Sequence, residues 1–151
     1  MHGRQLGHSE WHEVTQHQID LFAEATWDRQ WIHVDAERAA RGPYGGTIAH
    51  GFLTISLTPA LMAEIWSVEG IDMTVNRGLG EVVLHAPLPV GARVRMRAEL
   101  VETRPRPRGF LEAHFRLVFE GDHGEGIRRV ATAMLTLLLH VADPTGPVAA
   151  E

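Results

Sequence analysis

A long apolar segment followed by a series of β-type segments constrains the fold of this chain more than any other feature. Residues 47–66, TIAHGFLTISLTPALMAEIW, carry apolar side chains on nearly every face of a helix. Such a helix is typically buried, and Pro59 inside it predicts a bend or a first turn. Short β-type runs follow in residues 70–91, and three longer strands are expected over residues 92–104, 109–121 and 126–141.

The longer strands are expected to form antiparallel hairpins. In residues 93–100 apolar side chains alternate with charged ones, which indicates a strand with one buried face. The arginines at 93, 95 and 97 then lie on an exposed strand face or at the rim of a dimer. Residues 105–109 and 121–126 supply the hairpin loops. One antiparallel sheet wrapped around one long central helix is the economical α+β arrangement, and it is similar to the hotdog fold.

Shorter helical segments precede this unit. Thr15 and Gln18 have the spacing of a capping box, which predicts a helix over residues 15–26. A second short helix is expected over residues 35–40 with Asp35 as its cap, and residues 42–46 are rich in glycine and proline, which predicts a turn. The first helix leads the chain directly to Asp28.

Length and composition limit the classes of function. A chain of 151 residues fits one domain, here residues 1–140, followed by a loose tail at residues 141–151. There is no cysteine, which excludes disulfide and thiolate chemistry. The net charge of −5 argues against nucleic-acid binding. The N-terminus does not resemble a signal peptide, and no apolar stretch is long enough for a membrane helix, so we expect a cytoplasmic protein.

The stretch WDRQWIH at residues 27–33 brings a carboxylate and an imidazole close together in the sequence. Asp28 and His33 are separated by four residues. Histidine has an unperturbed pKa of about 6.5, close to the usual operating pH of an acid–base catalyst. Taken alone, an aspartate here is typical of a turn and a histidine of a structural position, so the choice depends on the sequence that follows.

Three stretches resemble the MaoC-like (R)-specific enoyl-CoA hydratase/dehydratase family, in its nodulation-protein-N-like branch. They are WDRQWIH at 27–33, GPYGGTIAHGFLTISL at 42–57 and APLPVGARVRMRAEL at 86–100. The family motif is approximately G-D-x-N-P-[ILV]-H, with His-Gly at the start of a later helix. The resemblance covers about residues 10–140. Trp27, Gln30 and Trp31 depart from the motif, and so do Arg77 and Val83 in the branch pattern.

This resemblance implies a lyase of the enoyl-CoA hydratase 2 type. Asp28 and His33 would act on one water and hydrate a trans-2-enoyl-CoA to the (R)-3-hydroxyacyl thioester. Backbone N–H groups at the start of the buried helix have no intrahelical partner, so Gly51 is expected to stabilise the thioester oxygen. The resemblance implies a homodimer and an acyl-CoA substrate, with no cofactor and no metal.

Further residues are weaker candidates for substrate binding. Gln30, Tyr44, His50, Ser56 and Arg77 can each contact the substrate, although Gln30 and Tyr44 are as readily explained by packing and Ser56 by a place in the core. His50 is better explained as a residue that fixes the loop before the helix. Trp27 and Trp31 are expected to pack rather than to bind a ligand. Carrier phosphates suit arginine, and the candidates are Arg77, Arg104, Arg106 and Arg108.

Two other functions remain open. A hotdog thioesterase tends to carry an acidic residue on its central helix, where this chain has only Glu64, far from the helix start. A non-catalytic acyl-binding protein would not need the Asp28–His33 pair. A metal site on a helix is suggested by His8 and His12 at i and i+4, but a third ligand is lacking, which favours a solvated face.

Overall fold

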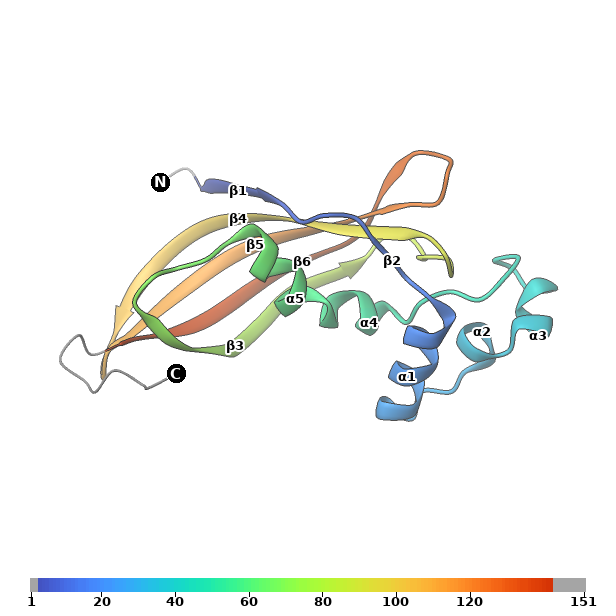
Figure 1. Ribbon diagram of the computed structural model, residues 1–151, viewed down its shortest axis with the longest axis horizontal. Helices are drawn as coiled ribbons and strands as arrows, with labels where there is room; N and C mark the ends of the chain where they lie inside the picture. The colour runs from blue at the N-terminus through green and yellow to red at the C-terminus, as the bar shows by residue number, and fades with distance from the viewer. Residues whose placement is uncertain (1–2, 143–151) are drawn as a thin grey trace, which may run out of the picture.

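A computed structural model describes residues 3–142 (Figure 1). Two short strands, β1 (Arg4–His8) and β2 (His12–Glu13), precede the helices α1 (Gln16–Thr26), α2 (Trp31–Val34) and α3 (Ala36–Ala40). Two further helices, α4 (Gly51–Ser56) and α5 (Thr58–Ile65), lead into the strands β3 (Ile71–Leu84), β4 (Arg93–Arg106), β5 (Phe110–Asp122) and β6 (Ile127–Val141). The tail predicted over 141–151 lies outside the described residues from 143 onward.

The strands form one antiparallel sheet in the order β1-β4-β5-β6-β3, and β2 also pairs with β4. The sheet curves around α4 and α5, while α1, α2 and α3 gather beyond one end of it (Figure 1). The sheet wrapped around a helical segment is the arrangement that the sequence predicted. The hairpin loops at 107–109 and 123–126 also lie within the predicted ranges.

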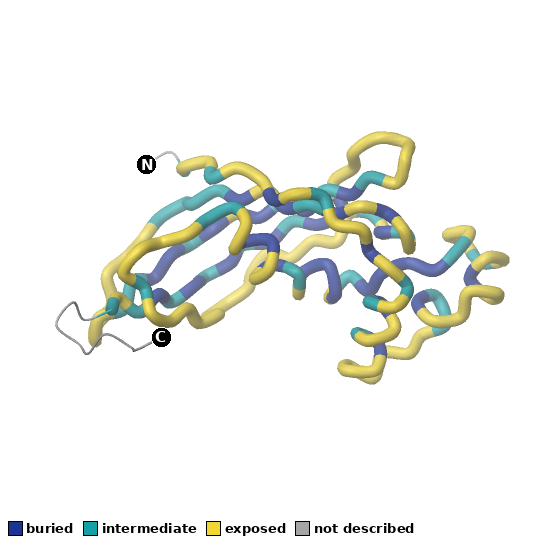
Figure 2. The backbone as a smooth tube through the Cα atoms, viewed as in Figure 1, coloured by how far each residue is buried: buried dark blue, intermediate teal, exposed yellow. Residues whose placement is uncertain are grey.

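Alternation along β4, β5 and β6 builds the core. Val94, Met96 and Ala98 are fully buried on β4, whereas Arg95 and Arg97 between them are half-buried and exposed, respectively. Figure 2 shows the same alternation along the neighbouring strands. Because successive side chains of a strand point to opposite faces, one face of the sheet packs against the helices. The largest fully buried side chains include those of Phe115, Phe119, Ile19, Met96, Leu117 and Leu139.

The central helix is shorter than predicted and is interrupted. Residues 47–50 are not helical, because Ile48 forms a β-bridge with Pro89. The helix starts at Gly51, breaks at Leu57 and resumes as α5, with Pro59 in its first turn, where its missing N–H is tolerated. The expectation of burial on all faces is also wrong, since the side chain of Phe52 is 72% exposed.

The short helices begin at the predicted caps. The Thr15 hydroxyl accepts a hydrogen bond from the Gln18 N–H at 3.2 Å, and the Asp35 carboxylate accepts one from the Arg38 N–H at 3.0 Å. Helix α1 ends at Trp27, whose φ of 65° is left-handed. Trp27 is 82% exposed, so the expectation that it packs is wrong. None of the helices in residues 3–142 is long and apolar enough to cross a membrane.

Strand β3 lies at an edge of the sheet. The sequence predicted several short runs here, but the structure has one strand of 14 residues with three register shifts against β6. Its other edge pairs with no strand in residues 3–142. All its residues except Ile71 are exposed, and the exposed apolar ones are Met73, Val75, Leu79, Val82, Val83 and Leu84.

Candidate active site

The loop after α1 brings Asp28 toward two buried histidines. Asp28 is exposed in the loop between α1 and α2, His33 lies on α2, and His50 directly precedes α4. One carboxylate oxygen of Asp28 and one ring nitrogen of each histidine lie within 4.8 Å of one another. The pair that was predicted from a spacing of five residues is therefore close in space, and His50 joins it.

The ring of His33 has a defined orientation. Its side chain is buried, and Nδ1 lies 2.7 Å from the Ile48 carbonyl oxygen. A carbonyl only accepts, so Nδ1 carries the proton and the lone pair of the neutral ring lies on Nε2. Burial lowers the pKa of His33 below 6.5, opposed by the hydrogen bond to Ile48; the charge of His50 lowers this pKa further and that of Asp28 raises it. The neutral form is favoured.

Gln16 holds the backbone of His33 in place. Its amide nitrogen donates to the His33 carbonyl at 2.7 Å and to the Asp20 carboxylate at 2.8 Å. Its amide oxygen accepts a hydrogen bond from the Thr47 hydroxyl at 2.5 Å. One side chain of α1 therefore connects α2 to the segment before α4. Gln16 could not be predicted from the sequence, because its partners His33 and Thr47 are 17 and 31 residues away.

His50 contacts both members of the pair. Its Nε2 lies 2.9 Å from the Asp28 carbonyl oxygen, and its ring stacks on that of His33 at a centroid distance of 3.9 Å and an angle of 24°. Zinc ligands aim their lone pairs at a common point about 2.0–2.1 Å from each nitrogen. The lone pairs of stacked rings lie in nearly parallel planes, so we assign no metal to Asp28, His33 and His50.

His33 opens onto a pocket of about 270 Å³ that Tyr44 and Gly51 also line. Its other walls are mostly apolar and come from the Ile48–Ala49 segment, Thr54, residues 84–88 and β6. The Leu84 side chain lies directly against Gly51, so a Cβ added at position 51 would require the exposed Leu84 side chain to move. Glycine leaves the backbone at position 51 close to the pocket.

Gln30 and the remaining weaker candidates separate into two groups. Gln30 is exposed at the start of α2, and its backbone N–H lies 3.4 Å from the Asp28 carboxylate. Ser56 and Arg77 instead line a second cavity of about 430 Å³ between α4–α5 and β3. Ser56 is exposed, so its predicted place in the core is wrong.

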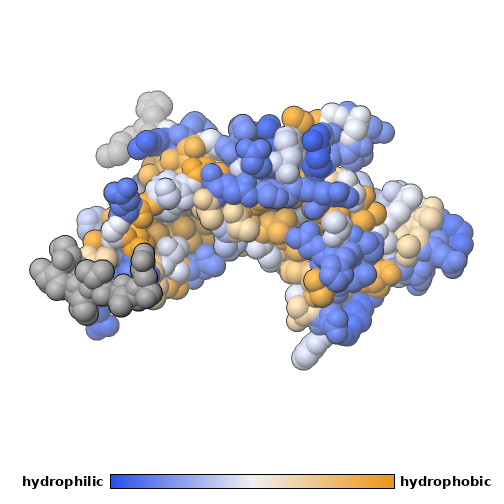
Figure 3. Space-filling view, in the orientation of Figure 1, coloured by the Kyte–Doolittle hydropathy of each residue, from blue (hydrophilic) through white to orange (hydrophobic). Residues whose placement is uncertain are grey.

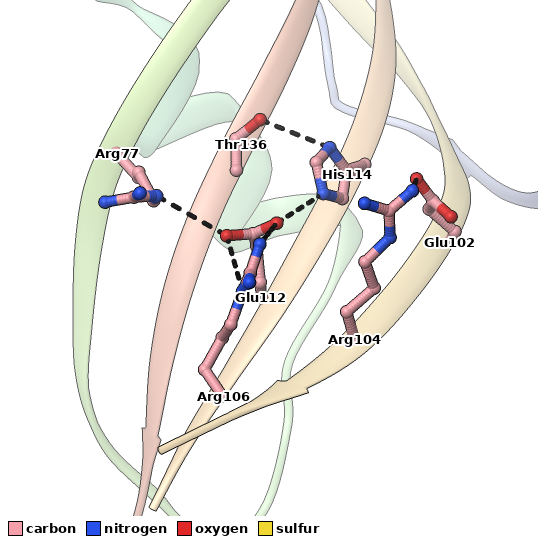
Figure 4. A network of polar contacts seen from close by, with 7 residues as sticks. All are labelled: Arg77, Glu102, Arg104, Arg106, Glu112, His114 and Thr136. Carbon is pink, nitrogen blue, oxygen red and sulfur yellow. Dashed lines mark hydrogen bonds and ion pairs between the residues drawn. The ribbon is translucent and has the colours of Figure 1, made fainter. Parts of the chain in front are cut away.

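Three of the four arginines proposed for carrier phosphates are held by acidic residues. Arg77 and Arg106 both contact the carboxylate of Glu112, and His114 contacts it too (Figure 4). Arg104 pairs with Glu102 at 2.7 Å. The hairpin that contains Arg106 and Arg108 lies at the opposite end of the sheet from α1–α3 (Figure 1). Within one chain these arginines therefore do not join the Asp28–His33 pair.

His12, considered as a metal ligand, and Glu64, considered as a thioesterase residue, contact each other. His12 lies on β2 and its Nε2 is 2.6 Å from the Glu64 carboxylate, which also accepts the Glu10 N–H at 2.9 Å. His8 lies on β1 and its Nδ1 contacts the Ser9 carbonyl. The helical spacing suggested for His8 and His12 is wrong, because both residues are in strands.

Comparison with known proteins identifies the family. The model of the MaoC like domain matches residues 1–111. The chain belongs to the MaoC-like domain family. It is 48% identical over 111 residues to 3-hydroxyacyl-thioester dehydratase Z of Mycobacterium tuberculosis, covering 74% of each chain. It is 45% identical over 120 residues to nodulation protein N of Rhizobium leguminosarum bv. viciae, covering 78% of this chain and 74% of that protein.

Solved structures of MaoC-like proteins share the fold. The (R)-hydratase from A. caviae involved in PHA biosynthesis aligns with a TM-score of 0.71 at 19% identity, over 91% of this chain and 95% of that one. The monoamine oxidase regulatory protein from Archaeoglobus fulgius aligns with a TM-score of 0.74 at 22% identity, over 95% and 92%. The hotdog fold predicted from the sequence is confirmed.

Proposed function

We propose that this MaoC-like protein is a hydro-lyase that interconverts trans-2-enoyl-CoA and (R)-3-hydroxyacyl-CoA thioesters. The observation that carries the proposal is the convergence of the Asp28 carboxylate on His33, whose proton is held on Nδ1 by the Ile48 carbonyl. A fixed neutral imidazole beside a carboxylate suits acid–base work on a water molecule. No cofactor is needed for this reaction.

The reaction needs a base for water and a proton for Cα. The Nε2 lone pair of His33 accepts a proton from the water while the water oxygen attacks Cβ, and the Asp28 carboxylate orients the second O–H. The proton held by the pair is then delivered to Cα, so both elements of one water enter the product. The lowered pKa of His33 supports this role, because a base must be neutral before it accepts a proton.

Negative charge on the thioester oxygen is stabilised by the backbone at Gly51. The first N–H groups of a helix lack intrahelical acceptors, and Gly51 begins α4. Gly51 lines the same pocket as His33, which supports a single binding site for the reacting end of the thioester. Loss of one such donor costs about 10²–10³-fold in kcat in measured cases.

The relatives support the class of substrate. The mycobacterial relative is named as a 3-hydroxyacyl-thioester dehydratase. A further relative, 33% identical over 99 residues, is the 3-hydroxybutyryl-CoA dehydratase of Methylorubrum extorquens. The thioesterase alternative has less support, because Glu64 is already bound by His12 and by the Glu10 N–H.

A homodimer is the proposed assembly, formed along β3. An exposed strand edge readily pairs with another strand, and β3 offers 14 residues with several exposed apolar side chains. Apolar residues also gather in the hollow beneath the sheet (Figure 3). Sedimentation of the wild type and of Leu79→Arg tests this assembly. We expect the wild type to be a dimer and Leu79→Arg to be a monomer. A monomeric wild type would contradict the proposed assembly.

The activity is tested with crotonyl-CoA and a longer trans-2-enoyl-CoA. Loss of ultraviolet absorbance of the conjugated thioester is followed together with the release of free CoA. Wild-type protein is expected to remove the absorbance without releasing CoA. The Asp28→Asn variant is expected to leave the absorbance unchanged. Release of CoA by the wild type would instead identify a thioesterase. No change with either thioester, for folded protein, would count against the hydratase.

A further inference from the structure

His50 is a buried titratable residue that the reaction described above does not use. It is only 2% exposed. Its ring contacts His33 on one side, and the Phe22 ring of α1 lies 4.9 Å away. Its backbone leads directly into Gly51. One residue therefore touches all three parts of the proposed site.

The two contacts of the His50 side chain are of different kinds. Its Nε2–H donates to the Asp28 carbonyl, which fixes the loop that carries the carboxylate. Its ring face covers the ring of His33, which limits rotation of that ring about its side-chain bonds. The remaining atom, Nδ1, is buried and has no hydrogen-bond partner in the part of the chain that the structure describes.

We propose that His50 is a positioning residue, which sets the Asp28 carboxylate and the His33 ring at the separation that the reaction needs. This inference rests on the proposed hydratase function. His50 acts through the Asp28 carbonyl and the His33 ring, which are the groups of the pair that its side chain contacts. A displacement of about 1 Å in such a group can lower a rate by about 10²-fold.

Two substitutions separate the two contacts. His50→Phe keeps an aromatic ring against His33 but removes the N–H that binds the Asp28 carbonyl. His50→Gln keeps a terminal N–H donor at the position of Nε2 but removes the ring. We expect His50→Phe to lower kcat by about 10²-fold with little change in KM, and His50→Gln to recover part of this loss. His17→Phe, at an exposed position on α1, is the matched control and should behave as wild type.

The pH dependence of kcat/KM tests whether His50 acts on His33. The titratable groups near His33 are His50 and Asp28, and His85 lines the same pocket. The charge of His50 lowers the pKa of His33. Both His50 variants should therefore move the acid limb to higher pH. A loss of packing that exposed His33 would move it in the same direction, because burial is the main cause of the lowered pKa. The partial recovery of kcat in His50→Gln is therefore the result that indicates positioning.

Three results overturn the proposal. The first is wild-type kcat and an unchanged acid limb in a folded His50→Phe. The second is a loss equal to that of His33→Ala with no recovery in His50→Gln, because His50 would then act in the chemistry itself. The third would be ¹⁵N NMR signals of the His33 imidazole that are unaltered in His50→Phe, a measurement that does not depend on turnover. If the wild type hydrates nothing but these signals move, the proposed function fails and the positioning role stands.

Discussion

Asp28, His33 and His50 form one cluster, the Asp28 cluster, and Glu112 with Arg77, Arg106 and His114 forms another, the Glu112 network. Both join a carboxylate to imidazole, yet they are built in opposite ways. At the candidate site the carboxylate is exposed and the histidines are buried, and no arginine pairs with Asp28 among the described residues. In the network the Glu112 side chain is only 4% exposed and is held by Arg77, Arg106 and His114 (Figure 4). The first arrangement leaves lone pairs available to a water, and the second occupies them with cations.

The electrostatics follow the same division. Hydrogen bonds from Arg106 and His114 lower the pKa of Glu112 to about 2, against the opposing effect of burial. At the other cluster burial lowers the pKa of His33 and keeps it neutral. The Glu112 network therefore joins β3, β4 and β5 as a structural tie, and the Asp28 cluster retains the capacity to exchange protons.

Exchanging the acids for amides should produce the largest contrast. Asp28→Asn is expected to lower kcat by about 10²–10⁴-fold while its melting temperature stays near that of wild type, because the side chain is exposed. Glu112→Gln should retain hydration activity. Steady-state kinetics and thermal melts of both variants test this crossed pattern. Full activity in Asp28→Asn would remove the aspartate from the mechanism.

An arginine placed beside Asp28 should pair with its carboxylate, as Arg77 and Arg106 pair with Glu112. In Gln30→Arg the new guanidinium can pair with the nearby Asp28 carboxylate, which then orients water less well. We expect kcat to fall by about tenfold, which is less than the roughly 10²–10⁴-fold that a positioned acid or base contributes, because the carboxylate is paired and not removed. The loss should shrink at high salt, because the ion pair would be exposed and screened. An equal loss at low and high salt would argue for a steric cause.

The pH profile gives a smaller effect. Because the neutral form of His33 is active and its pKa lies below 6.5, the acid limb of kcat/KM should fall below that pH. Activity should therefore be constant at neutral pH and decline only as His33 becomes protonated. Initial rates across the acidic range measure the limb. A limb above 6.5 would contradict the burial-driven shift.

The smallest expected effect concerns stability at acid pH. The pKa of Glu112 is lowered from 4.5 to about 2 in the folded chain, so its contribution is present above 4.5 and is lost as pH falls toward 2. Glu112→Gln should lower the melting temperature by a few degrees at neutral pH and by progressively less as the pH falls through this window. A constant difference between the two proteins would show that Glu112 acts by packing alone.

Local patterns in the sequence were enough to predict the helix caps and the alternation of β4, because each depends on residues that are close in the sequence. The pairing of Asp28 with His33 was predicted only with the help of the family resemblance. Two sets of contacts depend instead on the tertiary packing of α1, α2 and the segment before α4. They are the hydrogen bonds of Gln16 with His33 and Thr47, and the stacking of His50 on His33. Sequence periodicity carries no information on such long-range contacts, so they could not be predicted.

The errors have physical causes of the same kind. The helix predicted from residue 47 begins only at 51, because Ile48 finds a strand partner at Pro89, and tertiary pairing overrides a local helical pattern. Trp27 was expected to pack rather than to bind a ligand, but it is the left-handed C-cap of α1 and its side chain is exposed.

The order of the strands has a consequence for how this chain folds during synthesis. Of the strands in residues 3–142, β6 is made last, yet it lies between β5 and β3, and Ile71 pairs with Val141. At the other edge Arg4 pairs with Leu100. The edge strand β3 therefore stays without its partner β6 until residues 127–141 have left the ribosome, since pairings this distant in sequence form late and slowly. A ribosome stalled before residue 127 should carry an incomplete sheet that depends on chaperones for protection.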